Sequence, residues 1–294
     1  MKKWVVVTGA RGFVGSRVVQ KLTRQGYCVA GVLREGCNSD VSTDKGCAAW
    51  TTMSGLPTFL ENKSLFAVVH LATDYGRDGR LCDVLESNVQ LPLKLLTLCA
   101  ASNCAMFLCT DTFFGKPEFN YPYMRPYIYS KRDFVHWAKL FCDQHPLMRV
   151  SNLRLEHVYG DGDGPHKFVP DLITKLQNNQ PVIPMTLGDQ LRDFVYVDDV
   201  ADAYATLLAQ GDGLPVGFTE YEVGTGTTTS IREFSELASR ITGSRSQMHF
   251  GELAHRPNEI MASKAFTSPL KFYGWSATTT VFEGLTRSLG GSVS

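Results

Sequence analysis

The chain alternates between short apolar runs and longer segments in which apolar residues recur every three or four positions. The short runs are rich in β-branched residues and predict buried strands at residues 5–7, 28–33, 66–71, 105–109 and 148–153. The longer segments predict helices at residues 16–25, 89–100, 131–142 and 170–177. Strands and helices that alternate in this way form a parallel sheet with helices on both faces.

The pattern changes near residue 156. Glycine, proline and aspartate cluster at residues 160–165, and an extended stretch follows the last predicted helix at 181–184. We therefore expect an α/β fold with a doubly wound parallel sheet, the Rossmann type, over residues 1–155 and a smaller lobe over 156–294. Part of 193–224 is expected to rejoin the sheet. Ligands of such sheets bind at the carboxyl ends of the strands, which here face the cleft between the lobes.

Three glycines follow the first strand at three-residue spacing, Gly9, Gly12 and Gly15. Gly9 and Gly12 allow a tight turn against a pyrophosphate, and Gly15 lets the next helix pack closely on the strand. Free amide groups at the start of that helix then face the anion. An ordinary glycine-rich turn has the same spacing, but the strand before it and the helix after it favour a dinucleotide site.

Tyr127 and Lys131 are four residues apart and share one face of a helix. An ammonium beside a phenol lowers the pKa of the phenol, which predicts Tyr127 as a general acid or base. Tyr129 has Asp133 four residues later and lacks such a partner. A surface pair on an amphipathic helix would have the same spacing as Tyr127 and Lys131.

Composition excludes several other classes of function. The 294 residues carry 29 basic and 29 acidic side chains, so we expect no nucleic-acid partner and no anionic membrane surface. The chain has no apolar stretch of bilayer length, and its first residues do not resemble a signal peptide. The 8 cysteines form no C-x-x-C pair and the 7 histidines no H-x-x-x-H pair, so we expect no metal site. Reduced thiols in apolar surroundings indicate a cytoplasmic protein.

These motifs together resemble the short-chain dehydrogenase/reductase family, in its extended branch that acts on nucleotide sugars. The resemblance rests on residues 8–15, 70–73, 88–89, 110, 127–131, 153–160, 192–200, 221–226 and 256–259. Within this branch, residues 70–76, 119–127 and 154–160 resemble reductases of the CDP-abequose synthase type.

The resemblance implies a role for each matching residue. Thr110 would bind the substrate carbonyl, Tyr127 would exchange the proton, and Lys131 would hold the nicotinamide ribose. Tyr127, Lys131 and a further set would bind the cofactor: Gly9, Arg11, Gly12, Phe13, Val14, Gly15, Arg34, Leu71, Ala72, Thr73 and Asn88. The nucleotide sugar would contact Thr112, His157, Lys167, Arg192 and Arg256. The two arginines would meet its diphosphate, although either alone could form a surface salt bridge.

The end of the second strand predicts the cofactor. NAD enzymes of this kind place an acidic residue there for the ribose 2′-hydroxyl. This chain has Leu33 followed by Arg34, and Arg11 lies inside the glycine loop. Two guanidinium groups favour a 2′-phosphate, so we expect NADP(H). Residues 50–53 lack the aspartate that the family places near the adenine.

The stretch after Thr110 selects among reactions. Thr112 replaces the glutamate of nucleotide-sugar 4,6-dehydratases. Reductases that also epimerise have a cysteine at this same position, whereas Cys109 lies on the opposite side of an extended segment. A 4-epimerase would retain NAD, which the missing acidic residue disfavours. The resemblance thus implies reduction by NADPH of CDP-4-dehydro-3,6-dideoxy-D-glucose to CDP-abequose, or its C4 epimer CDP-paratose, for O-antigen synthesis.

Other functions remain open alternatives. They are a reductase of another sugar nucleotide, such as a dTDP-4-keto-6-deoxyhexose, a nucleotide-sugar 4-epimerase, and a non-catalytic NADP-binding regulator. Related enzymes dimerise through the helix that bears Tyr127, which here also carries Phe134, Val135, Trp137 and Leu140. We therefore expect a homodimer, although these side chains could instead belong to the core of one chain.

Overall fold

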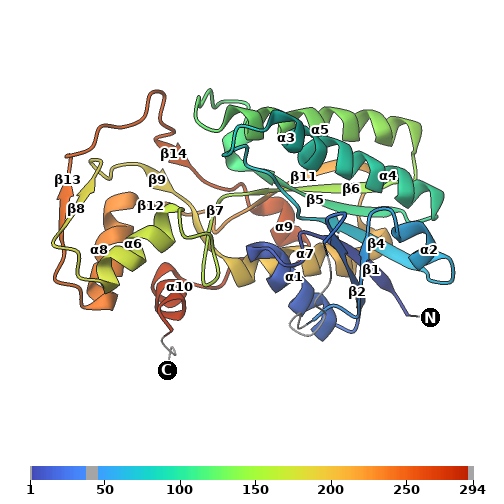
Figure 1. Cartoon of the computed structure of the whole chain (residues 1–294), viewed down its shortest axis with the longest axis horizontal. Helices are drawn as coiled ribbons and strands as arrows, with labels where there is room; N and C mark the ends of the chain where they lie inside the picture. The colour runs from blue at the N-terminus through green and yellow to red at the C-terminus, as the bar shows by residue number, and fades with distance from the viewer. Residues whose placement is uncertain (1, 38–45, 291–294) are drawn as a thin grey trace.

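A seven-stranded parallel sheet forms the centre of the computed structural model, which describes residues 2–37 and 46–290 (Figure 1). The strand order is β3-β2-β1-β4-β5-β6-β11. The strands are β1 (Trp4–Thr8), β2 (Cys28–Leu33), β3 (Ala49–Thr52), β4 (Leu65–His70), β5 (Met106–Thr112), β6 (Arg149–Leu155) and β11 (Gly217–Val223). The order reverses between β1 and β4, so the structure confirms the doubly wound α/β fold.

Helices cover both faces of this sheet (Figure 1). One face carries α1 (Phe13–Arg24), α7 (Val197–Gln210) and α9 (Ser268–Phe272). The other carries α2 (Leu56–Leu60), α3 (Leu81–Leu85), a π-helical turn η2 (Glu86–Gln90), α4 (Leu91–Ala101) and α5 (Arg125–Gln144). Val5 and Val7 pack into the first core and Val6 into the second, so the apolar run of β1 is buried on both sides.

The second lobe is built from small sheets and three helices. Strands β7 (His157–Tyr159) and β10 (Phe194–Tyr196) pair, as do β8 (Val182–Met185) and β13 (Gln247–Phe250). A three-stranded sheet joins β12 (Thr229–Ser230), β9 (Leu191–Arg192) and β14 (Ala262–Ser263). The helices are α6 (Phe168–Gln177), α8 (Ile231–Thr242) and α10 (Val281–Ser288). Phe194 and Phe234 stack with their ring centroids 4.0 Å apart at the centre of this lobe's core.

After β10 the chain leaves the second lobe and returns to the central sheet. Helix α7 packs against α1, and β11 pairs with β6 from Gly217 to Val223. A short 3-10 turn, η4 (Gly211–Gly213), joins them. The later segment containing Leu270 and Trp275 also packs into the core beside α7.

Several elements are longer than their sequence patterns predict. Helix α1 begins at Phe13 because Gly12 has the extended backbone of an N-cap. Helix α5 begins at Arg125 rather than residue 131, and Pro126 lies in its first turn, where proline is tolerated. Strand β5 continues to Thr112 and is followed by a 3-10 turn, η3 (Phe113–Gly115). Strand β3 was not predicted, because it is a short edge strand with two threonines.

Candidate functional site

A cavity of about 1730 Å³ lies at the carboxyl ends of the central strands and extends to the second lobe. Most side chains predicted for the site line it. They are Gly9, Arg11, Gly12, Phe13, Val14, Gly15, Arg34, Leu71, Ala72, Thr73, Thr110, Thr112, Tyr127, His157, Lys167, Arg192 and Arg256. Asn88 and Lys131 are buried behind the wall.

The glycine loop is shaped for close approach of a ligand. Gly9 has φ +66, and a Cβ there would lie 2.7 Å from the amide nitrogen of Ala72. A Cβ on Gly15 would lie 2.0 Å from the carbonyl oxygen of Gly9. Neither position can carry a side chain without moving the backbone, and the start of α1 faces the cavity. These residues therefore fit a dinucleotide pyrophosphate.

The proton-transfer pair has a different electrostatic state from the one its spacing predicts. Burial, followed by the neighbouring Tyr75 phenol, raises the pKa of Tyr127 well above its ordinary value. Burial outweighs any lowering of this pKa by Lys131, whose Nζ lies 6.0 Å from the centroid of the Tyr127 ring. Lys131 Nζ donates to Thr73 Oγ1 at 3.1 Å and to the carbonyl oxygen of Thr110 at 2.9 Å. Tyr127 therefore keeps its proton at neutral pH, which is the state of a general acid.

Two threonines at the end of β5 make different contacts. The Thr112 side chain lies close enough to the Tyr127 phenol to lower its pKa, an effect that burial outweighs. Thr110 Oγ1 instead donates to the carbonyl oxygen of His70 at 3.2 Å and lies 2.6 Å from the hydroxyl of Tyr204 on α7. The structure thus brings Thr112, which the sequence assigns to substrate binding, to the proton donor.

Asn88 lies behind the cavity wall, and its side chain is held by other residues of the protein. Its side-chain amide donates to the carbonyl oxygen of Asp74 at 2.7 Å and to Ser130 Oγ at 2.9 Å. Its side-chain oxygen accepts from the amide of Asp74 at 2.9 Å. Both ends of the amide are therefore used within the protein, where they hold the loop after β4 against α5.

The far end of the cavity, beside β2 and β3, contains an aromatic residue and two arginines. The Trp50 ring lies over Gly31, where a Cβ would come within 2.3 Å of it. The guanidinium carbon of Arg11 is 4.8 Å from the ring centroid of Trp50. Arg34 is exposed at the edge of the cavity, and the Glu35 carboxylate accepts from the amide of Ser54 at 2.9 Å. The carboxylate of Glu35, two residues after β2, is thus already hydrogen-bonded to Ser54.

Arg192 and Arg256, the arginines expected to meet the diphosphate, are joined through Glu259 and Tyr121, which received no role of their own. Arg192 Nη2 donates to Glu259 Oε1 at 2.8 Å. The hydroxyl of Tyr121 donates to Glu259 Oε2 at 3.4 Å and accepts from Arg256 Nη1 at 3.2 Å. The guanidinium carbon of Arg256 also lies 4.1 Å from the ring centroid of Tyr123. Glu259 lies in the same four-residue motif as Arg256, and this position in the sequence could have identified it as a site residue.

A histidine and a lysine complete this side of the cavity. Burial, and then the charges of Arg192 and Lys167, lower the pKa of His157 to about 3. His157 is therefore neutral at physiological pH and can offer a hydrogen bond but no charge. Lys167 Nζ lies 2.7 Å from Asp163 Oδ1 and 5.5 Å from the ring centroid of Tyr75.

Within residues 2–37 and 46–290, no three His, Cys, Asp or Glu side chains are grouped to hold a metal ion. Across the same part of the chain, no helix is long and apolar enough to cross a membrane. The eight cysteines are free thiols.

Known proteins resemble this chain over most of its length. The model of the NAD dependent epimerase/dehydratase family matches residues 5–224. The CDP-abequose synthase of Salmonella typhimurium strain LT2 is 39% identical over 281 residues, which cover 94% of this chain and 93% of that enzyme. The CDP-abequose synthase of Salmonella muenchen is 37% identical over 291 residues and 98% of each chain. The solved structure of MoeE5 in complex with UDP-glucose and NAD has a TM-score of 0.81 at 24% identity, covering 97% of each chain.

Proposed function

The chain belongs to the NAD dependent epimerase/dehydratase family, and on that premise we propose that it is a cytoplasmic NADPH-dependent reductase of nucleotide sugars. Its substrate would be the C4 keto group of a nucleotide-linked deoxyhexose, namely CDP-4-dehydro-3,6-dideoxy-D-glucose. The product would be CDP-abequose, or its C4 epimer CDP-paratose, for O-antigen synthesis. The 39% identity to a CDP-abequose synthase supports this substrate.

The observation that carries the proposal is the Tyr127 phenol on the wall of the cavity that the glycine loop and Thr112 also line. When bound, NADPH would supply the hydride that reduces the C4 carbonyl carbon. Tyr127 would give its proton to the C4 oxygen as negative charge develops there, which leaves an alcohol on the sugar. The glycine loop and the start of α1 would hold the pyrophosphate. A nicotinamide cofactor is also the one bound by MoeE5, which shares this fold.

The side chains around Tyr127 argue against dehydration. Asp111 Oδ2 accepts from Arg154 Nε and from Asn152 Nδ2, each at 3.2 Å. Asp111 Oδ1 accepts from the amide of Thr112 at 2.7 Å, so both of its oxygens are engaged. The buried Cys109 thiol lies 3.3 Å from Asn152 Oδ1, and burial raises its pKa. Neither group is available as the base that removal of the C5 proton requires.

Aromatic side chains beside Tyr127 fit a deoxygenated sugar. The ring centroid of Tyr75 lies 5.0 Å from that of Tyr127, and Phe114 stacks on Tyr121 at 5.5 Å. A sugar hydroxyl facing such rings would lose hydrogen bonds to water without replacing them, which costs free energy. A 3,6-dideoxyhexose lacks hydroxyls at two positions and avoids this cost.

The purified protein should consume NADPH with CDP-4-dehydro-3,6-dideoxy-D-glucose and do so more slowly with a dTDP-4-keto-6-deoxyhexose. NMR of the product would then distinguish CDP-abequose from CDP-paratose by the configuration at C4. Interconversion of nucleotide sugars without net NADPH consumption would indicate a 4-epimerase. NADPH binding without turnover of any of these sugars would instead favour a non-catalytic regulator.

We further propose that the protein is a homodimer that associates through α5 and α3. Phe134 belongs to the core of its own chain, whereas the side chain of Trp137 is 52% exposed. Leu140 and Tyr129 on α5 are also exposed, together with Leu81 and Leu85 on α3, which packs against α5. Exposed apolar side chains on two packed helices are typical of a protein–protein interface.

Trp137→Glu should therefore shift the protein from dimer to monomer, because a buried carboxylate at the interface would have no partner. Sedimentation velocity at several concentrations measures this change. Phe272→Glu is the matched control, since Phe272 is 83% exposed on α9 at the opposite face of the sheet. A wild-type protein that sediments as a monomer would contradict the proposal.

A further inference from the structure

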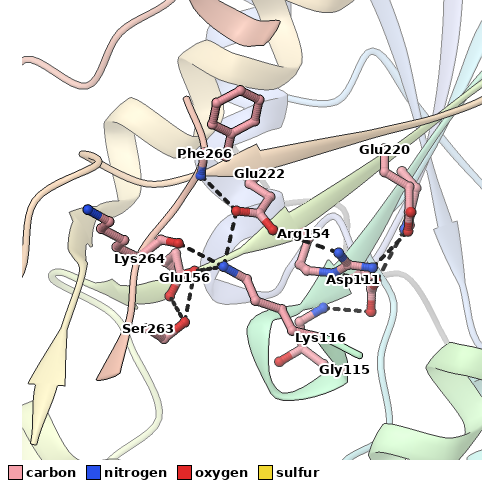
Figure 2. Close-up of polar contacts among 12 residues, drawn as sticks. Asp111, Gly115, Lys116, Arg154, Glu156, Glu220, Glu222, Ser263, Lys264 and Phe266 are labelled. Atoms are coloured by element: carbon pink, nitrogen blue, oxygen red, sulfur yellow. Dashed lines mark hydrogen bonds and ion pairs between the residues drawn. The ribbon is translucent and has the colours of Figure 1, made fainter. Parts of the chain in front are cut away.

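Lys116 is a buried charged residue outside the proton-transfer pair and the predicted ligand contacts. It follows the 3-10 turn η3, directly after the strand that carries Thr110 and Thr112, and it is 5% exposed. Figure 2 shows its side chain extending from that turn toward two glutamates and the segment that contains Ser263 and Phe266. A lysine is rarely buried to this extent unless it is paired.

All three N–H donors of the Lys116 ammonium have acceptors. Its Nζ lies 2.7 Å from Glu156 Oε1 and 3.0 Å from Glu222 Oε2, and it donates to the carbonyl oxygen of Lys264 at 2.8 Å. Burial alone would lower the pKa of Lys116, but Glu156 and Glu222 outweigh it and raise the pKa. The ammonium is therefore held as a cation among three fixed oxygens.

These acceptors join the central sheet to the second lobe. Glu156 follows β6 and Glu222 lies in β11, both in the central domain. Ser263 Oγ hydrogen-bonds to both carboxylate oxygens of Glu156, at 3.0 and 2.8 Å. The amide of Phe266 donates to Glu222 Oε2 at 2.7 Å. The glutamates that bind Lys116 thus also hold the chain on both sides of Lys264.

The same contacts reach the substrate arginine. Ser263 in β14 is the register partner of Arg192 in β9. The position of Arg192 therefore depends on where Glu156 holds Ser263, and Glu156 is in turn held by Lys116. Lys116 is thus linked to Arg192 through an ion pair with Glu156, the hydrogen bonds of Glu156 with Ser263, and the pairing of β14 with β9.

The backbone around Lys116 is tied to the helix of the proton donor. Arg132, the residue after Lys131 on α5, donates to the carbonyl oxygens of Gly115 at 3.2 Å and Lys116 at 3.0 Å. It also donates to the carbonyl oxygen of Phe119 at 3.1 Å. Lys116 thus connects the helix of Tyr127 with the small sheet of Arg192.

We propose that Lys116 is a positioning residue, which sets the location of Arg192 relative to Tyr127. It does so by binding Glu156, Glu222 and the 263–266 segment, and we call this set of contacts the clasp. The role in turnover rests on the proposed reductase function. The physical reason is that a nucleotide sugar anchored by its diphosphate must present C4 to Tyr127, so a shift of the anchor misplaces the reacting carbon.

Lys116→Met keeps the length of the side chain and removes its charge. We expect kcat/KM for the nucleotide sugar to fall roughly tenfold to a hundredfold, through a higher KM and a lower kcat. The Kd of NADPH should stay within about twofold, because the glycine loop and Arg34 lie outside the clasp. Lys116→Arg keeps the charge and should restore part of the loss.

Ser263→Ala is the second variant, and it carries the test if Lys116→Met does not fold. It removes one hydroxyl and leaves the Lys116–Glu156 ion pair in place, so a raised KM for the sugar is again expected. Lys21→Met is the matched control, since Lys21 pairs with Asp202 between α1 and α7, away from the 263–266 segment. An unchanged KM in either clasp variant, or an equal loss of NADPH binding, would overturn the proposal.

Amide hydrogen exchange tests the positioning role of Lys116 independently of the proposed reductase activity. Lys116→Met should speed amide exchange in residues 262–266 and 190–193, where the Leu191 amide bonds to the Met261 carbonyl, but not in the glycine loop. If the wild-type protein reduces no sugar nucleotide, the reductase function fails while this measurement still decides on the clasp. An exchange rate that is unchanged in the variant, or that rises equally throughout the protein, would contradict the positioning role of Lys116.

Discussion

Replacing Tyr127 by phenylalanine is expected to lower kcat by roughly 10² to 10⁴-fold, the usual contribution of a positioned general acid. The ring and its packing against Tyr75 are retained, so the cavity keeps its shape. What is lost is the proton that the C4 oxygen needs as hydride arrives. NADPH should bind the variant with wild-type affinity, which fluorescence titration can check beside the turnover assay.

Tyr129→Phe is the matched control for this substitution, because Tyr129 lies on the same helix but outside the cavity lining. It should leave kcat unchanged. The pH profile provides a second check: since burial raises the pKa of Tyr127, the alkaline limb, on which the rate falls as this phenol loses its proton, should begin only well into the alkaline range. A Tyr127→Phe enzyme that retains most of its kcat would show that another group donates the proton.

The elements that hold the site follow from local sequence. The apolar run of β1 has few alternatives to a buried parallel strand, and Gly9 and Gly15 occupy positions where a Cβ would meet backbone. Tyr127 and Lys131 lie on one helix as their spacing requires. The fold and the motif residues on the cavity wall were therefore predictable from short-range patterns.

The electrostatic state of the site was not predictable in this way. Helical spacing brings Lys131 near Tyr127, but the direction of its ammonium depends on Thr73 in the loop after β4 and on the carbonyl of Thr110 in β5. Desolvation then outweighs any local attraction and raises the pKa of Tyr127. The same reasoning applies to Asn88, whose partners Asp74 and Ser130 are distant in sequence.

Residues that received no role of their own were the other omission. Glu259 and Tyr121 contact Arg192 and Arg256, and Lys116 joins Glu156 and Glu222 to the segment after β14. Each is a single polar residue whose partners are distant in sequence. Only the packing of two lobes buries them, so no local pattern distinguishes them from solvated side chains.

Replacing Arg34 and Arg11 together by alanine is expected to weaken NADPH binding by about two orders of magnitude while changing NADH binding little. Each guanidinium would contribute charged hydrogen bonds to the 2′-phosphate, at roughly 1.5–3 kcal/mol per bond to a charged group before screening by solvent. Arg34 is exposed, so its share lies at the low end and should shrink as salt is added. Arg11 lies over Trp50, which holds its charge at the same end of the cavity.

The phosphate-specific effect is best measured with fragments of the cofactor. Adenosine 2′,5′-bisphosphate should compete with NADPH far better than 5′-AMP in the wild-type protein and lose this advantage in the double variant. Arg24→Ala serves as the control, because Arg24 is an exposed arginine in the last turn of α1, outside the cavity lining. Glu35 provides a further comparison: its carboxylate is held by Ser54, so Glu35→Gln should weaken NADH binding no more than slightly. Equal losses for NADPH and NADH in the double variant would mean that the arginines support the fold of this end of the cavity and do not read the 2′-phosphate.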